Sequence, residues 1–594
     1  MKPSTSPDPF AFLPPSLKPL AVVVALLGVC FLAFFNGLGD LGLMDKTEAL
    51  FVEVGHQMLV SGDWVTPYWN GTTFFDYPVW GYWMVALSFK LFGTTAFAAR
   101  LPVAVAASVV VIATFGLLWR LAPRDLPEAQ RLGRGLLGAS VLATTPAWIG
   151  WARSSTTDMF LSSAITLALY GFALVELAPR SAGERRWEGP LGRIAMALFA
   201  GIAVLAKGPV GLLLPGLVIV VFLALRGGLT RWLRPAPLLA MALLFLGVTA
   251  PWYAAAAKAN GMAFIGGFLG FSNLQRFTSV LYSHPGPPWF YLPWVLILVL
   301  PWSLLLPLTI ARTRFWRRAS WRQTPSSEAL PQFLLVWLVA IVAFFSAAAT
   351  KLPGYVLPAM PAAALLVAQL FGPGGLARPG WPLRVSVGAD ALVLSLAAVA
   401  AALAPGWVAT DPAYPTFASA LRSSGLPLAL CVVLAATAAA CWWLLARGRS
   451  AQVWVPNVAG FLALLTVVVA PLAPLLDRER QLPLRQLQAK AGAEERPDEP
   501  LWVIGYPRYS TVFYADRSAV FIGDAGEARD RLRREPQVLG VTPATASVLL
   551  LGDREHLEGF QLPRSAVQPL GRRGEQLLWR IQLGALVPGN ALGS

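Results

Sequence analysis

The sequence predicts an all-α polytopic membrane protein that ends in a small soluble α/β domain. The first observation is composition: 56% of the 594 residues are hydrophobic and only 13% are charged, a balance that excludes an ordinary soluble globule. The second is that apolar runs of roughly 17 to 25 residues recur along the chain, each long enough to cross a ~30 Å hydrocarbon core as a helix. The third is an abrupt change to polar sequence after residue 476.

The apolar runs predict about 13 transmembrane helices. Their approximate limits are 19–38, 100–121, 132–150, 159–177, 192–206, 209–226, 235–256, 289–310, 331–349, 353–371, 386–404, 425–446 and 453–475. The first run is too long for the apolar region of a typical signal peptide, so we expect an uncleaved first helix.

The short aromatic segment 78–93 decides the predicted orientation. If this segment lies in the membrane interface, the arginine-rich loops, such as those with Arg124, Arg314 and Arg447, share one side. If it spans the membrane, those loops move outside, against the positive-inside rule. We therefore expect an interfacial helix here, a cytoplasmic N-terminus and, because the number of spans is odd, an external C-terminal domain.

The composition divides the chain into three parts. Residues 1–18 form a cytoplasmic N-terminus, residues 19–475 form the transmembrane domain with an external loop at 39–99, and residues 476–594 form the extracytoplasmic α/β domain. In the last part, "LWVIGY", "SAVFIGD" and "ASVLLLGD" predict strands that helical or loop segments separate.

The basic residues and cysteines exclude several functions. The net charge of +16 does not indicate a nucleic-acid surface, because the arginines lie in short clusters between apolar runs, as membrane topology requires. Cys30, Cys431 and Cys441 lie inside apolar runs without the spacing of metal ligands, so we expect neither a disulfide framework nor a zinc site.

Charged side chains on the expected external side are candidates for function. Asp45 and Glu48 lie in the first external loop, on one face if a helix begins there, and Arg153 precedes Asp158 in "ARSSTTDMF". Lys207 lies between two spans. Cations beside carboxylates at a membrane surface suit the binding of a lipid-linked phosphate together with activation of an acceptor. Snorkelling to lipid headgroups explains any one of these cations equally well, but it explains the whole set less well.

Several motifs between residues 36 and 371 occur in a recognisable order. After the acidic first loop they are "SGDWVTPYWNG", "FFDYPVWGYW", "ARSSTTDMF", "AKGPVGLLLPG", "PWY", "NLQRF", "PGPPWFYLP" and "FFSAAATKLPGYVLPAMPA". In this order the chain resembles the GT-C superfamily of membrane glycosyltransferases, in particular the lipid A aminoarabinose transferase and protein O-mannosyltransferase family. The resemblance implies an enzyme that transfers a sugar from a polyprenyl-phosphate carrier to a lipid, glycan or protein acceptor, with inversion, at the outer face of the bacterial cytoplasmic membrane.

The resemblance also implies roles for individual residues. An acid in the first external loop acts as a base or stabilises the transition state electrostatically, and cations hold the leaving phosphate. The candidate catalytic residues are Asp45, Glu48 and Asp158. The candidate substrate-binding residues are Asp76, Tyr77, Arg153, Lys207, Arg276, His284, Lys351 and Tyr355.

The chain departs from the family pattern at three places. Relatives commonly have an adjacent Asp-Glu pair in the first loop, where this chain has Thr47 before Glu48. Their "FEKP" is here "FDYP", so Tyr77 replaces a lysine that is expected to contact lipid phosphate. Phe271 occupies the place of a histidine that helps to hold a metal, although His284 is a possible substitute. We therefore expect no certain cofactor, with a divalent metal left open, and a different sugar or acceptor.

Two other classes of function remain as alternatives. A transporter or flippase for lipid-linked sugars would show internal repeats and charges near mid-span, and neither is evident in the sequence. A membrane scaffold without catalytic activity would agree with the loss of the family residues at Thr47 and Tyr77. The expected partners are a polyprenyl-phosphate sugar, an acceptor and membrane lipids, and no nucleic acid.

Overall fold

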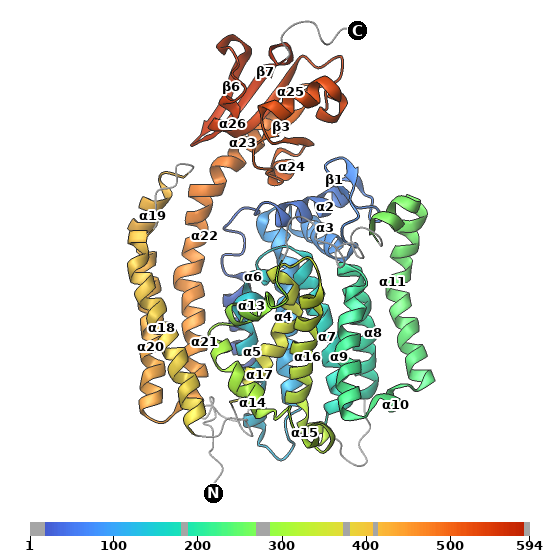
Figure 1. Ribbon diagram of the computed structural model, residues 1–594, viewed down its shortest axis with the longest axis vertical. Helices are drawn as coiled ribbons and strands as arrows, with labels where there is room; N and C mark the ends of the chain where they lie inside the picture. Colours follow the sequence, from blue (N-terminus) through green and yellow to red (C-terminus); the bar gives the residue numbers. More distant parts are fainter. Residues whose placement is uncertain (1–17, 180–187, 269–285, 372–379, 408–413, 587–594) are drawn as a thin grey trace.

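The computed structural model describes residues 18–179, 188–268, 286–371, 380–407 and 414–586. Long helices form a bundle, and a small sheet domain covers one of its ends (Figure 1). This architecture confirms the predicted fold class.

The first helices and the first hairpin precede the main bundle. They are α1 (Lys18–Cys30), the π-helix η2 (Phe31–Phe35), α2 (Thr47–Ser61), β1 (Tyr68–Trp69), β2 (Thr72–Thr73) and α3 (Trp80–Phe92). With 13 residues, α3 is only ~20 Å long, too short to cross a ~30 Å core. Together α2 and α3 lie at the end of the bundle that faces the sheet domain (Figure 1).

The remaining helices of the bundle follow in chain order. They are α4 (Ala96–Arg120), α5 (Glu128–Ala143), α6 (Pro146–Ala152), α7 (Thr157–Leu177), α8 (Glu188–Lys207), α9 (Val210–Arg226), α10 (Leu229–Trp232), α11 (Pro235–Phe264), α13 (Tyr291–Leu298), α14 (Leu306–Arg312), α15 (Arg318–Arg322), α16 (Leu330–Ala347), α17 (Met360–Ala368), α18 (Trp381–Trp407), α19 (Phe417–Ser423), α20 (Leu426–Ala446), α21 (Trp454–Leu464), α22 (Ala470–Leu476) and α23 (Leu482–Ala493). Short 3₁₀ turns and π-helical stretches join some of them, including η6 (Pro353–Ala359), η8 (Leu465–Val469) and η9 (Asp477–Gln481).

The predicted count of 13 spans is not confirmed. Within the described residues, nine helices are long and apolar enough to cross a membrane, or ten if the bent pair of α13 and α14 counts as one span. The other predicted spans contain shorter or broken helices. Proline explains the breaks, because it removes a helical hydrogen bond: Pro146 separates α5 from α6, Pro301 lies in the 117° bend, and Pro353 begins η6.

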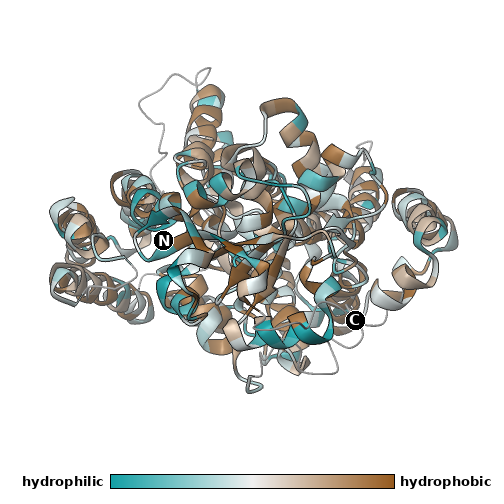
Figure 2. Cartoon of the chain, turned by 90° about the horizontal axis from the view of Figure 1, so that it is seen from above, coloured by the Kyte–Doolittle hydropathy of each residue, from teal (hydrophilic) through white to brown (hydrophobic). Residues whose placement is uncertain are grey.

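Burial distinguishes the central helices from the outer ones. In α7 the most apolar 18-residue window is 83% buried, whereas in α11 it is 11% buried. Large apolar side chains on the outer helices stay exposed, for example Leu239, Leu396 and Leu428. Figure 2 shows hydrophobic residues along most helices of the bundle, seen end-on. Only a hydrocarbon solvent leaves so much apolar surface uncovered without cost, so the chain is a multi-pass membrane protein.

The C-terminal domain contains one five-stranded sheet in the order β4-β3-β5-β7-β6. Its strands are β3 (Leu501–Ile504), β4 (Ala519–Ile522), β5 (Ser547–Asp553), β6 (Val567–Arg573) and β7 (Gln576–Gln582). Its helices are α24 (Ser510–Ala515), α25 (Ala525–Arg534) and α26 (Arg554–Glu558). Strand β3 pairs in parallel with β4 and β5, and β7 pairs antiparallel with β5 and β6. The three predicted strands are β3, β4 and β5.

A long helical segment connects the bundle to this sheet. Residues Ser450–Ala493 run as a nearly continuous helix through η8 and η9, and α23 then packs against the sheet and α24. The domain also contacts the first loop, residues 39–99, directly, since His56 in α2 lies against Phe513 in α24. Two elements from opposite ends of the sequence thereby cover the same end of the bundle (Figure 1).

Candidate active site

An ion pair between two helix ends forms the centre of the candidate site. Lys207 is the last residue of α8, and Gly208, with a φ of 81°, turns the chain away from the helix. Asp158 lies in the first turn of α7, where the helix dipole favours a negative charge. The Lys207 ammonium donates a hydrogen bond to Asp158 Oδ1. Both side chains keep some access to solvent, 13% for Lys207 and 20% for Asp158.

Two tyrosine rings flank the Lys207 ammonium. The Lys207 Nζ lies 5.1 Å from the ring centroid of Tyr355 in η6 and 5.7 Å from that of Tyr77, which precedes α3. A cation over aromatic faces at these distances is stabilised electrostatically. Four of the sequence-predicted residues therefore meet at one place, and half-buried Asp76 is the chain neighbour of Tyr77.

Glu48 is buried and hydrogen-bonded through both carboxylate oxygens. Arg100 in α4 donates to both, from Nε to Oε1 and from Nη2 to Oε2, at 2.8 Å each. The backbone N–H of Ser155 donates to Oε1 at 2.9 Å, and that of Met44 donates to Oε2 at 2.9 Å. With 2% of its surface exposed, Glu48 fixes the first loop to α4 and to the chain before α7.

Asp45 contacts the C-terminal domain. The backbone N–H of Ser510, the first residue of α24, donates to Asp45 Oδ1 at 2.6 Å. Burial raises the pKa of the Asp45 carboxyl, although hydrogen bonds from Ser510 and the charges of Arg508 and Lys46 act in the opposite direction. The Lys46 ammonium lies 4.5 Å from the Tyr506 ring centroid. Asp45 thus lies between the membrane bundle and the sheet domain.

The hairpin of the first loop extends this contact to strand β4. Asn70 Nδ2 donates to Ala519 O at 2.8 Å, and Ala519 N donates to Asn70 Oδ1 at 2.9 Å. The Trp69 ring stacks on Phe521 with a centroid distance of 6.0 Å. The amide group of one loop residue therefore completes the backbone hydrogen bonding at the start of an edge strand.

The chain segment before α2 contacts the same domain through its backbone. Gly42 N donates to Asp477 Oδ1 at 2.7 Å, and Leu43 N donates to the Tyr514 hydroxyl at 2.8 Å. Sequence reasoning missed these partners because they are separated by 435 and 471 residues. Periodicity carries no signal for such distant pairs.

His56 contributes a titratable group at the same contact. Its Nδ1 lies 3.4 Å from Glu53 Oε2, and its ring meets Phe513 edge-on at 5.5 Å. Burial lowers the pKa of His56, but the hydrogen bond and charge of Glu53, with a further contribution from Asp516, outweigh it and leave the pKa raised.

Two other predicted cations bind backbone carbonyl groups. Arg153 Nη2 donates to Asn36 O at 2.7 Å, at the end of η2. Lys351 Nζ donates to Ser346 O at 2.9 Å and to Ala348 O at 2.5 Å, where it caps the C-terminus of α16. Both side chains thus support the ends of helices on the site-facing side.

The remaining predicted residues cannot be placed. Arg276 and His284, both predicted to bind substrate, lie outside the described residues, as does Phe271. Among the residues that are described, no group of three or more His, Cys, Asp or Glu side chains is arranged to hold a metal ion.

Comparison with known proteins shows which sequence families and solved structures this chain resembles. The sequence profile of dolichyl-phosphate-mannose-protein mannosyltransferases matches residues 76–254, and that of the C-terminal domain of cyanobacterial RgtA-type glycosyltransferases matches residues 494–588. The crystal structure of ArnT from Cupriavidus metallidurans bound to undecaprenyl phosphate superposes with a TM-score of 0.72, covering 98% of this chain and 100% of that one at 22% identity. The chain therefore has the fold of ArnT.

Sequence relatives agree with the GT-C fold and with the predicted resemblance. The undecaprenyl phosphate-α-4-amino-4-deoxy-L-arabinose arabinosyl transferase of Pseudomonas aeruginosa strain UCBPP-PA14 is 33% identical over 345 residues, 58% of each chain. The enzyme of the same name from Shewanella sediminis is 31% identical over 350 residues, 59% of each chain. The chain therefore matches less than two thirds of the length of these relatives. The resemblance to GT-C glycosyltransferases is confirmed.

Proposed function

We propose that this protein is a glycosyltransferase that moves a sugar from a polyprenyl-phosphate carrier to a lipid, glycan or protein acceptor. The observation that carries the proposal is the Lys207–Asp158 pair between Tyr77 and Tyr355, at the end of a GT-C bundle. The fold is that of a protein crystallised with undecaprenyl phosphate, and the sequence relatives are named for transfer from that carrier.

The proposed reaction is a direct displacement at the anomeric carbon. An acceptor oxygen attacks that carbon, the bond from the carbon to the carrier phosphate oxygen breaks, and the phosphate leaves with the bonding electron pair, which inverts the centre. The acceptor proton passes to a carboxylate. The Lys207 ammonium stabilises the negative charge that grows on the leaving phosphate. Binding of the phosphate to Lys207 weakens the ion pair between Lys207 and Asp158.

The carboxylates have different proposed roles. Asp158 and Asp76 face the sugar or the acceptor beside Lys207. Asp45 is our candidate base, because it is an acid of the first loop, to which the resemblance assigns acceptor activation; burial raises the pKa of its carboxyl. Glu48 positions the loop through Arg100 rather than meeting substrate. The remaining predicted ligands, Arg276 and His284 among them, keep their proposed roles in substrate binding.

The distribution of the arginine clusters determines the membrane orientation that we propose for the chain. The loops at the end opposite the sheet domain contain most of the arginine clusters, so we assign that end to the cytoplasm and the sheet domain to the outer side of a bacterial inner membrane. We also propose that residues 1–18, 19–475 and 476–594 are the cytoplasmic, catalytic and external parts, and that the external part supports the catalytic loop.

The test is transfer of radiolabelled sugar from a panel of polyprenyl-phosphate sugars to membrane acceptors. Asp45→Asn and Lys207→Gln should each reduce transfer by about 10²- to 10⁴-fold, the range for loss of a proton-transfer group or of electrostatic stabilisation. The matched control is Glu558→Gln, which removes an exposed carboxylate from α26 of the C-terminal domain. This variant should transfer sugar at the wild-type rate.

The outcomes separate the alternatives. No transfer from any donor by well-folded wild-type protein would overturn the enzyme proposal and favour a scaffold. If labelled donor crosses the membrane without reacting, the protein is a flippase. Equal transfer by wild type and Asp45→Asn would keep the enzyme and remove the role assigned to Asp45.

A further inference from the structure

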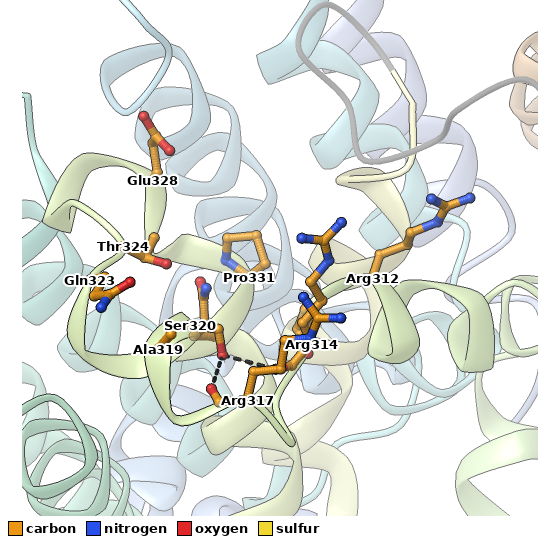
Figure 3. A pocket seen from close by; sticks show the side chains of 11 residues that line it. Arg312, Arg314, Arg317, Ala319, Ser320, Gln323, Thr324, Glu328 and Pro331 are labelled. Atoms are coloured by element: carbon orange, nitrogen blue, oxygen red, sulfur yellow. Dashed lines mark hydrogen bonds between the residues drawn. The ribbon is translucent and has the colours of Figure 1, made fainter.

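A basic pocket lies at the end of the bundle opposite the sheet domain. It has a volume of about 590 Å³ and lies between the end of α14, α15 and the start of α16 (Figure 3). The side chains on which its chemistry depends are Arg312, Arg314, Arg317, Ser320, Glu328 and Gln332. No role in the proposed transfer reaction involves this end of the molecule.

The backbone around the pocket is fixed by hydrogen bonds. Ser320 Oγ donates to Arg314 O at 2.9 Å and to Arg317 O at 2.7 Å (Figure 3). Trp321 Nε1 donates to Phe315 O at 2.7 Å, and Arg226 Nη2 from α9 donates to Thr324 O at 2.8 Å. The pocket is therefore preformed, which lowers the cost of ordering it when a ligand binds.

The polar groups of the pocket lack partners within the chain. In the part of the chain that the structure describes, the guanidinium groups of Arg312, Arg314 and Arg317 form no ion pair or hydrogen bond, and Glu328 is the one carboxylate in the lining. Gln332, only 6% exposed, has an Oε1 without a hydrogen-bond donor. A buried acceptor without a donor is costly, so a ligand that brings a donor would be stabilised here.

An exposed aromatic pair adjoins these arginines. Phe315 is 45% exposed and Trp316 is 60% exposed, and their rings meet edge-on at 5.2 Å. Aromatic side chains next to arginines, at the end of apolar helices, are typical of the headgroup region of a bilayer. These neighbours are the ones expected of a site at the depth of lipid phosphates.

We propose that this pocket binds the phosphate of an anionic phospholipid whose headgroup carries a hydroxyl. The arginines receive the phosphate oxygens through charge-assisted hydrogen bonds, and the headgroup hydroxyl donates to Gln332 Oε1. A soluble phosphate ester with a hydroxyl shares this chemistry, but the exposed aromatic pair favours the lipid source.

The test is native mass spectrometry of the delipidated full-length protein in detergent, titrated with phosphatidylglycerol, with phosphatidylcholine and with glycerol 3-phosphate. We expect phosphatidylglycerol to bind the wild type more tightly than either of the others. The double variant Arg314→Gln/Arg317→Gln should bind it at least about tenfold more weakly, because two charge-assisted hydrogen bonds are lost. Arg447→Gln/Arg449→Gln removes two exposed arginines that directly follow α20, whose C-terminus lies at the same end of the bundle (Figure 1), and is the matched control.

Three outcomes would overturn the proposal. They are equal binding by the pocket variant and the wild type, equal weakening by the control variant, and tighter binding of glycerol 3-phosphate than of phosphatidylglycerol, which would identify a soluble ligand. Because the readout is lipid binding, none of these results depends on the transfer activity.

A second variant tests the role of Gln332 without changing charge. Gln332→Met removes the amide and keeps an apolar side chain of similar length. It should abolish the preference for phosphatidylglycerol over phosphatidic acid, which has no headgroup hydroxyl, while phosphatidic acid binds as it does to wild type. An unchanged preference would show that no hydroxyl reaches Gln332.

Discussion

At the end of the bundle that faces the sheet domain, Arg100, Lys207 and Lys351 each bind an acceptor within the chain. At the opposite end, Arg312, Arg314 and Arg317 bind none among the described residues. Paired cations fix helices and loops, and an incoming anion must displace their partners. Unpaired cations add little to the stability of the fold and are free to receive an anion. The position of a cation alone does not show whether it stabilises the fold through an internal partner or binds an incoming anion.

Breaking the Arg100–Glu48 pair should have the largest effect on stability. Arg100→Met leaves the buried Glu48 carboxylate without its main partner, which should destabilise the protein by ~3–5 kcal/mol. Thermal unfolding in detergent measures this change. The matched control is Arg314→Gln at the opposite end, which should change stability by less than ~0.5 kcal/mol.

A double variant sharpens the interpretation. Glu48→Gln together with Arg100→Met removes the uncompensated charge and should recover part of the lost stability. If Arg100→Met melted like the wild type, the buried pair would have no structural importance, and the contrast between the two ends would fail.

Removing the Asn70 side chain should have an intermediate effect. Asn70 has a φ of 51°, a conformation that glycine adopts freely, so Asn70→Gly deletes two hydrogen bonds to Ala519 without adding backbone strain. We expect a loss of about 1–3 kcal/mol, because the β4 backbone groups lose their partners. Hydrogen exchange should rise at residues 519–522. Thr73→Ala, exposed on β2, is the control, and equal exchange in both variants would contradict this role.

The pH dependence of stability at the same contact should be the smallest effect. The folded-state pKa of His56 is raised above its ordinary value of 6.5. Its contribution to stability is therefore complete below pH 6.5 and is lost as the pH rises through the folded-state pKa. The melting temperature of wild type minus that of His56→Gln should fall across this range. A difference that does not change with pH would exclude a charged His56 at the contact.

Much of the fold could be predicted from the sequence, because apolar runs and strand patterns are local signals. The bundle and the strands β3, β4 and β5 were identified from them. Strands β6 and β7 were missed, since "VQPLGRR" and "QLLWRIQ" are interrupted by polar and charged residues. The count of 13 spans is not confirmed among the described residues, because runs that contain proline, such as the one around Pro301, form broken helices.

The candidate site could be predicted only in part. The motif order named Lys207, Asp158, Tyr77 and Tyr355, and these residues meet in the structure. The partners of the first-loop acids could not be predicted, because Glu48 pairs 52 residues away and Asp45 binds a backbone N–H 465 residues away. Local spacing carries no information on pairs that only the tertiary fold brings together.

The contacts of the first loop with the C-terminal domain determine when the loop can reach its folded structure. Its hydrogen-bond partners lie 435 to 471 residues further along the chain. At ~5–20 residues per second, the ribosome supplies these partners roughly 20 to 90 seconds after the loop itself. The loop therefore stays incomplete through most of translation and membrane insertion. A chain that ends prematurely leaves the loop without these partners, so completion of the loop coincides with completion of the protein.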